Sequence, residues 1–351
     1  MSAHPFNESF RQPAEWDLHD SCWLAWPSAG ELWQQDLEPA RDEFVALCRA
    51  ISGVDCVIID RPIEKLNILV PDAQNLPLAK SALHGLPVTF HQIPFGDIWL
   101  RDTAPIFVTD LEGQVATVTF GFNGWGEKFA LPHDREVGGN IAVAAGVRRF
   151  QVPWFLEGGS VEVDGEGTCL TSRQCLLNPN RNSNMSQAQI EEALKLSLGA
   201  EKVLWLDEGL LNDHTDGHID TIARYVAPGR VACMEPSGCY DPNHRVMEKI
   251  AADLASFTDA RGRPLEVLRI PSPGMVPNEQ GHAMPASYLN FYIANRTVVV
   301  PTYGRPNDEA AVKAIAKLFP NRQTIGCSAR AILSGGGAFH CITQQQPWES
   351  K

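Results

Sequence analysis

A cysteine near the C-terminal end of the sequence has neighbours that suit a reactive thiol. Cys341 follows His340 and lies four residues beyond a run of three glycines, 335–337. Glycines allow close approach to the backbone, and a nearby histidine can lower the pKa of a thiol. Residues 338–343 are predicted to form a short strand that carries Cys341 near its end. Cys341 is therefore a candidate nucleophile, and a buried structural thiol is the alternative.

The segment 97–105 has the residue types of a site rim. Asp97 and Asp102 flank Trp99 and Arg101, and a proline ends the segment. In the simplest structural interpretation this is a charged turn in which Arg101 pairs with one of the aspartates. In the functional interpretation, Asp97, Trp99 and Asp102 contact a ligand.

A further carboxylate, Glu157, follows the apolar run 152–156 and precedes two glycines. A carboxylate at the end of a strand, next to glycines, suits close approach of a ligand to the backbone. A turn with a solvated glutamate is the competing explanation.

Two histidines and an aspartate lie in the segment 212–220. If residues 218–225 form a strand, His218 and Asp220 project from the same face, and such a pair is costly to bury without a purpose. His214, His218 and Asp220 could instead ligate zinc. However, the sequence has no HExxH motif, and Gly217 argues against a helix that carries both histidines. We therefore expect no metal.

Taken together, these residues suit a planar cation. Carboxylates bind a guanidinium group through paired hydrogen bonds, and a thiolate can attack its central carbon. The sequence has neither a GxGxxG fingerprint nor a P-loop, so no organic cofactor is expected. The predicted ligand is a small cationic guanidino compound.

The overall charge agrees with this ligand class. Acidic residues outnumber basic ones by 42 to 29, which gives a formal charge of −13 and would repel nucleic acid and anionic membranes. No apolar run is long enough to span a bilayer, and the N-terminal residues do not resemble a signal peptide. The nine cysteines are an odd number without a CxxC pair, which favours a reducing compartment. We expect a cytoplasmic enzyme.

Strand candidates alternate with single helices along the chain. Residues 290–295 belong to the longest strand candidate, 287–300, and are interpreted as core scaffold. The pattern predicts a repeated β-rich unit with one helix each, in one domain that spans residues 1–351. The predicted helices are 39–50, 186–198, 244–257 and 308–319, with weaker candidates at 76–83 and 136–145; the predicted strands are 56–59, 106–109, 115–120, 160–163, 218–227, 287–300 and 338–343.

These motifs, in this order, resemble those of the agmatine deiminases, in the bacterial-type peptidylarginine deiminase family of guanidino-group-modifying enzymes. The matching segments extend from about residue 20 to residue 347. They are CWLAWP at 22–27, WLRDT at 99–103, EGGS at 157–160, LNPNRN at 177–182, DGHID at 216–220, and GGG at 335–337 with HCITQQQP at 340–347.

The resemblance implies the pentein fold, a five-bladed α/β-propeller of ββαβ units with pseudo-five-fold symmetry. It also implies roles for individual residues. Cys341 resembles the nucleophile, and His218 the general acid and base. Glu157 resembles the carboxylate that supports His218, while Asp102 and Asp220 resemble the carboxylates that hold the guanidinium. The implied reaction converts agmatine to N-carbamoylputrescine and ammonia through a covalent S-alkylthiouronium intermediate.

Three positions depart from the family pattern. His214 stands where an acidic residue near the amine end of the substrate is usual, Ala338 where asparagine is usual, and Ala104 where glycine is usual. Peptidyl-arginine, arginine or another guanidino amine therefore stay open as substrates. An amidinotransferase, a metallohydrolase and a non-catalytic guanidino binder are further alternatives, and a homodimer is the assembly to test first.

Overall fold

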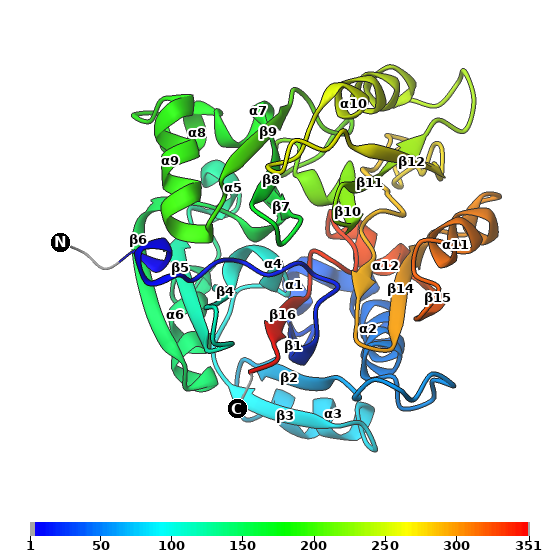
Figure 1. Cartoon of the computed structure of the whole chain (residues 1–351). Helices are drawn as coiled ribbons and strands as arrows, with labels where there is room; N and C mark the ends of the chain where they lie inside the picture. Colours follow the sequence, from blue (N-terminus) through cyan, green and yellow to red (C-terminus); the bar gives the residue numbers. More distant parts are fainter. Residues whose placement is uncertain (1–3, 350–351) are drawn as a thin grey trace.

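The computed structural model describes residues 4–349. The chain folds into five separate β-sheets with helices between their strands, and Figure 1 shows the sheets following one another around the molecule. A mixed α/β architecture is thus confirmed.

Four of the sheets repeat one connection. Two antiparallel strands are followed by a helix and then by a third strand parallel to the second. A helical crossover of this kind is what a parallel pair requires. The four units are β4 (Ile106–Thr109), β5 (Val115–Gly121), α6 (Asp134–Ala145) and β6 (Arg148–Phe155); β7 (Val161–Val163), β8 (Thr168–Ser172), α9 (Gln187–Leu198) and β9 (Lys202–Leu206); β10 (Ala223–Ala227), β11 (Arg230–Glu235), α10 (His244–Ser256) and β12 (Glu266–Pro271); and β13 (Tyr292–Ile293), β14 (Thr297–Thr302), α11 (Asp308–Ala316) and β15 (Gln323–Ser328).

The fifth sheet joins the two ends of the chain. Strand β16 (Gln344–Pro347) pairs antiparallel with β1 (His19–Ala25), and β1 is followed by α2 (Leu37–Ser52) and the parallel strand β2 (Lys65–Val70). The helix α3 (Asn75–Ala82) then leads to a further parallel strand, β3 (Val88–Gln92). In Figure 1 the red C-terminal strand lies beside the dark blue N-terminal one.

Short helical turns connect the larger elements and carry several residues of interest. They are α1 (Gly30–Trp33), α4 (Leu100–Thr103), α5 (Gly124–Glu127), α7 (Arg173–Leu176), α8 (Pro179–Asn182) and α12 (Arg330–Ser334), with the 3-10 turns η1 (Pro5–Glu8), η2 (Gln34–Asp36), η3 (Gly158–Ser160) and η4 (Ile219–Thr221).

All six predicted helices are present. Helix α9 begins with the predicted capping box, in which Ser186 and Gln189 each bond to the other's backbone amide, and ends at the left-handed Gly199. In α10, Met247, Ile250 and Leu254 form the buried stripe of an amphipathic helix.

Several strand predictions are wrong. Residues 56–59 form no strand. The predicted strand 218–227 begins only at Ala223, because 218–221 lead into and form the turn η4. Only parts of 287–300 are extended, and 338–343 is an irregular turn before β16. Apolar runs predict burial correctly at 287–300 and 338–343, but backbone shape there is set by tertiary contacts.

No helix within residues 4–349 is long and apolar enough to cross a membrane. All nine cysteines are free thiols, as the odd count and the lack of CxxC pairs predicted. Two hydrophobic clusters form the core, and the larger includes buried residues from Cys22 to Ile342.

Candidate active site

The candidate nucleophile Cys341 lies in the turn between α12 and β16, and its side chain is nearly buried. Its Sγ lies 3.6 Å from Oδ2 of Asp220 and accepts a hydrogen bond of 3.1 Å from Nδ2 of Asn290. Burial raises the pKa of the Cys341 thiol well above its usual value, and the negative charges of Asp220 and Asp102 raise it further. The thiol is therefore protonated at neutral pH in the absence of ligand.

Asn290 also fixes the backbone around the thiol. Its Oδ1 accepts hydrogen bonds from the amides of His340 at 3.0 Å and Cys341 at 3.3 Å. The sequence interpretation treated 290–295 as core scaffold, and these residues are indeed buried. The contact of Asn290 with Cys341 was not predicted, although a polar side chain inside an apolar run indicates a buried hydrogen-bond partner.

Asp220, in η4, is completely buried and held by His340. Nδ1 of His340 lies 2.7 Å from Oδ2 of Asp220, and its Nε2 lies 2.8 Å from Oε2 of Glu15. Burial alone would raise the pKa of Asp220, but the hydrogen bond and charge of His340 and the charge of His218 bring it below its usual value. Oδ1 of Asp220 has no hydrogen-bond partner among the described residues, so a buried acceptor is available to a ligand.

Asp102, in α4, is oriented by two donors. The indole of Trp125 donates to its Oδ2 at 2.8 Å, and the amide of Gly159 donates to its Oδ1 at 2.9 Å. Burial raises the pKa of Asp102, and Asp220 and Glu157 add to this, while His218 opposes it. Trp125 was not predicted as a site residue.

His218 lies between two carboxylates. Its Nδ1 is 3.8 Å from Oδ1 of Asp102 and its Nε2 is 4.0 Å from Oε2 of Glu157. Burial opposes protonation, but the charge of Asp102, together with Cys175 and Glu157, raises the pKa of His218 well above its usual value. These charges favour the protonated imidazole. His218 and Asp220 do not share a strand face as predicted; the turn η4 brings both to the same site.

Glu157 lies two residues after the end of β6, at the N-cap of η3, and is fixed by an arginine. Arg181, from the LNPNRN segment, donates from Nε to Oε1 of Glu157 at 2.7 Å and from its terminal nitrogen to Oδ2 of Asp216 at 2.7 Å. Arg181 and Glu157 are both buried. A buried ion pair of this kind fixes geometry, because either partner alone would be an uncompensated charge.

Gly159 shows how closely three of the predicted polar residues meet. A Cβ atom on Gly159 would lie 2.6 Å from Nδ1 of His218, 3.0 Å from Oδ1 of Asp102 and 3.2 Å from Oδ2 of Asp220. A side chain at this position would therefore enter the site. The EGGS motif provides both the carboxylate of Glu157 and the space beside it.

The predicted rim residues lie at one side of Cys341. The indoles of Trp33 and Trp99 donate to the two oxygens of Asp97 at 2.8 and 2.9 Å, and burial raises the pKa of Asp97. Trp99 borders the site, since a Cβ on Gly337 would lie 2.7 Å from its ring and 3.1 Å from Sγ of Cys341. Asp97 thus supports two tryptophans, and its oxygens are occupied by them.

Arg101 pairs with neither aspartate, contrary to the simplest structural interpretation. Its guanidinium donates to the carbonyl of His340 at 3.2 Å and to Oε1 of Gln345 at 2.7 Å. Arg101 thus holds the segment that carries Cys341.

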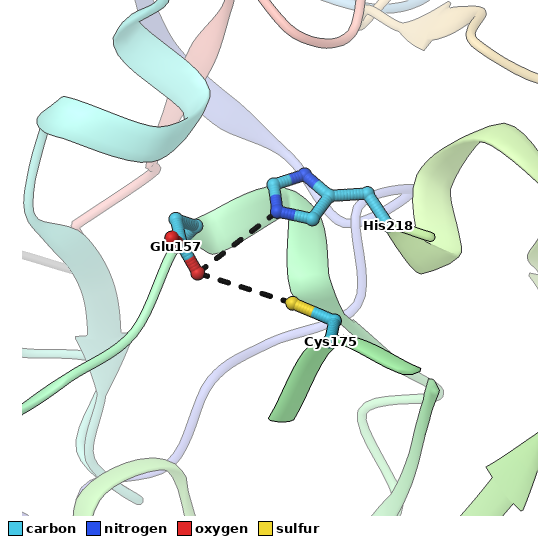
Figure 2. Close-up of side chains that lie close together, drawn as sticks. All are labelled: Glu157, Cys175 and His218. Atoms are coloured by element: carbon cyan, nitrogen blue, oxygen red, sulfur yellow. Dashed lines mark hydrogen bonds and ion pairs between the residues drawn. The ribbon is translucent and has the colours of Figure 1, made fainter. Parts of the chain in front are cut away.

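His214 lies at the surface, next to the glycine run. A Cβ on Gly336 would lie 3.1 Å from its Nδ1, and its ring packs against Phe129 with centroids 6.0 Å apart. The alternative zinc site of His214, His218 and Asp220 does not assemble in the part of the chain that the structure describes. A different group does: Glu157, Cys175 and His218 place one donor atom each within 4.8 Å of one another, as Figure 2 shows.

The model of the Porphyromonas-type peptidyl-arginine deiminase family matches residues 11–347. The chain belongs to this family. Residues 11–347 include every site residue described above.

Other members of the family align along nearly their whole length. The agmatine deiminase of Pseudomonas aeruginosa (strain LESB58) is 35% identical, with 98% of this chain and 97% of the relative covered. The solved structure of the agmatine deiminase of Enterococcus faecalis is 32% identical and superposes with a TM-score of 0.91, covering 99% of this chain and 98% of the other.

A more distant structure shares the fold alone. An amidinotransferase from Microseira wollei is 12% identical and has a TM-score of 0.51 over 98% of this chain and 99% of its own. The two proteins therefore share a mixed α/β fold.

Proposed function

We propose that this protein hydrolyses the guanidinium group of agmatine, giving N-carbamoylputrescine and ammonia. The observation that carries the proposal is the meeting of a thiol with two carboxylates. Sγ of Cys341 lies 3.6 Å from Asp220, and Asp102 and Asp220 both border the position of a Cβ on Gly159. The likeness to the two agmatine deiminases supports agmatine as the substrate.

Binding of a guanidinium suits the charges of the site. Asp220 has a buried oxygen without a hydrogen-bond partner among residues 4–349, and Asp102 borders the same Cβ position on Gly159. Two carboxylates fix the plane of the cation and place its carbon beside the thiol. The cation also cancels the negative charges that raise the pKa of Cys341, so substrate binding favours the thiolate.

The reaction then proceeds in two halves. As the cation binds, the Cys341 thiol loses its proton to solvent. The thiolate then adds to the guanidinium carbon, and His218 gives its proton to the nitrogen that leaves as ammonia. The remaining S-alkylthiouronium is attacked by a water that His218 deprotonates, and the thiol is released. One water is consumed and one ammonia is formed. Glu157 orients His218, since its carboxylate is itself fixed by Arg181.

The fold supports a central position for this site. We propose that the five sheets are the blades of a five-bladed α/β-propeller with pseudo-five-fold symmetry, and that residues 1–351 form one catalytic domain. Four sheets with the same ββαβ connection, and a fifth closed by β16 and β1, support this arrangement.

The experiment that tests the function is an assay of ammonia and ureido product from agmatine, with arginine and peptidyl-arginine compared in parallel. We expect agmatine to be turned over fastest, in the presence of a chelator as well as in its absence. Cys341→Ala should reduce kcat by at least about 1,000-fold because the covalent route is lost.

The matched control is Cys327→Ala, which removes a free thiol from β15 and should leave the rate near that of the unmodified protein. Turnover that survives Cys341→Ala would overturn the proposed nucleophile. Faster turnover of arginine or peptidyl-arginine than of agmatine would overturn the proposed substrate.

A further inference from the structure

The reaction proposed above does not use the second thiol of the site. Cys175, in α7, is completely buried. Its Sγ lies 4.0 Å from Oε2 of Glu157, the same oxygen that lies 4.0 Å from Nε2 of His218. Figure 2 shows the three side chains converging from separate segments of the chain.

Nε2 of His218 is a buried nitrogen atom without a hydrogen-bond partner among the described residues. His218 is only 1% exposed. Buried polar atoms without a partner are uncommon and point to a missing ligand or a functional role. This atom faces the carboxylate and the thiol of the same cluster.

We propose that Glu157, Cys175 and His218 form an inhibitory binding site for a thiophilic divalent cation such as Zn²⁺ or Cd²⁺. The metal is not part of the reaction. The metal would bind Nε2 of His218 and so block the proposed general acid and base. The inhibitory part of the proposal therefore rests on the proposed function, whereas the binding part does not.

The distances between the three donor atoms would suit such an ion if the side chains moved slightly closer together. In a tetrahedral zinc site the donor atoms lie roughly 3.3–3.6 Å apart, given usual Zn–S, Zn–N and Zn–O lengths. Here the three donor atoms lie within 4.8 Å of one another, and two of the separations are 4.0 Å. One sulfur, one imidazole nitrogen and one carboxylate oxygen are a donor set that zinc accepts.

The surroundings supply the other requirements of a metal site. Asp102 lies 3.8 Å from Nδ1 of His218, where its charge favours the tautomer that keeps the proton on Nδ1 and leaves Nε2 for the metal. A divalent cation with the thiolate of Cys175 and the carboxylate of Glu157 is neutral overall. Arg181 keeps a counter-charge, because it also pairs with Asp216.

Binding must release protons. Zinc and cadmium bind cysteine as the thiolate and histidine through an unprotonated nitrogen, so the metal displaces the proton of the Cys175 thiol. It also displaces the proton on Nε2 of His218. The measured affinity for metal should therefore rise with pH.

The first test measures binding to the full-length protein, freed of metal with a chelator. Cd²⁺ added to the unmodified protein should produce the ultraviolet absorption of a sulfur–cadmium bond, and Zn²⁺ should compete for it. Cys175→Ser should abolish this absorption and weaken Zn²⁺ binding by about 100-fold or more, as expected when a metal ligand is lost.

Two further variants identify the site. Cys169→Ser, at another buried cysteine on the neighbouring strand β8, should retain both signals. Cys341→Ala should also retain them if the metal is bound by Cys175. Loss of both signals in Cys341→Ala with retention in Cys175→Ser would place the metal on the nucleophile and overturn the proposal. Retention in both variants would show a surface site and overturn it too.

The second test measures inhibition by Zn²⁺, with each variant compared with its own metal-free rate on agmatine. The zinc concentration for half-inhibition should rise in Cys175→Ser and Cys175→Ala by the same factor as the dissociation constant. The two variants together separate loss of a ligand from local misfolding, which circular dichroism also checks. Inhibition unchanged in both variants would overturn the inhibitory role. Absence of any metal-free activity would instead contradict the proposed function, while the cadmium signal would still report on binding.

Discussion

At the scale of single residues, the pKa values of Cys341 and His218 are both raised, which favours a neutral form of the first and a charged form of the second. Burial and the aspartates raise the pKa of Cys341, while Asp102 and Glu157 raise the pKa of His218 despite its burial. A protonated thiol is a weak nucleophile. The raised pKa of Cys341 therefore disfavours alkylation of the free protein, and in the proposed reaction the bound cation activates the thiol.

A pH experiment follows from the sign of these shifts. Asp220 raises the pKa of Cys341, so Asp220→Asn should lower it and move the pH profile of Cys341 alkylation by iodoacetamide toward lower pH. The alkylated fraction at Cys341 is measured by mass spectrometry across pH 6–10. A displacement of about one unit or more is expected, since the charge lies next to the sulfur in a buried site.

The control for this experiment is Asp253→Asn, which removes a surface carboxylate that pairs with Lys249. Its alkylation profile should coincide with that of the unmodified protein. A profile of Asp220→Asn that stays in place, or moves toward higher pH, would contradict the proposed influence of Asp220 on the thiol.

The residues that bear the chemistry could be selected from the sequence, but their supports could not. Cys341, Glu157 and His218 stood out because reactive residue types lay beside glycines or strand ends. Asn290 is a polar residue in an apolar run, but this pattern does not identify Cys341 as its partner. Nothing local to Trp125 indicates that it bonds to Asp102. Such contacts join parts of the chain that are distant in sequence.

At the scale of elements, short turns rather than strands place the reactive groups. Asp102 lies in α4, Gly159 in η3 and Asp220 in η4, each only three or four residues long. These turns have no periodic pattern of their own. This explains why the longer amphipathic helices were predicted well while 218–221 and 338–343 were predicted as strands.

The turn η3 offers a test at this scale. Gly159→Ala places a methyl group 2.6 Å from His218 and 3.0 Å from Asp102, which forces both groups apart. We expect kcat to fall by about 100-fold or more, because small displacements of reacting groups are costly. Steady-state kinetics and thermal unfolding measure activity and folding separately.

Gly30→Ala is the matched substitution, since an added Cβ there would meet only ordinary contact at 3.9 Å from Leu37. It should leave kcat unchanged. If Gly159→Ala retained full activity, the close packing of η3 against the site would have no catalytic importance.

At the scale of the whole molecule, a buried ion network connects several sheets. Arg224 of β10 donates to Glu15 at 2.6 Å and to Glu162 of β7 at 3.0 Å, and also to the carbonyls of Leu289 and Phe291. Glu15 in turn bonds to His340, next to the nucleophile. The network thus joins the N-terminal segment, β7, β10 and the segment before β13.

Breaking this network should destabilise the protein strongly. Arg224→Met leaves Glu15 and Glu162 buried without their cation, which costs about 3–5 kcal/mol in the free energy of unfolding. Urea denaturation at pH 7.5 measures the loss.

The comparison is Arg230→Met, which removes a cation from an exposed pair with Glu266 and should cost less than about 1 kcal/mol. Equal effects of the two substitutions would contradict the importance of the buried network. Neither network nor sheet order could be predicted from composition, because every partner of Arg224 is far away in sequence.

The pairing of β16 with β1 has a consequence for incompletely assembled molecules. Asp102, Glu157, His218 and Asp220 all precede Cys341, which is held by the strand that pairs with the first one. A molecule in which this last pairing has opened would still present its acidic groups to a cation but would lack a positioned thiol. Such a molecule would bind the cation without hydrolysing it, so that turnover would report that β16 is paired with β1.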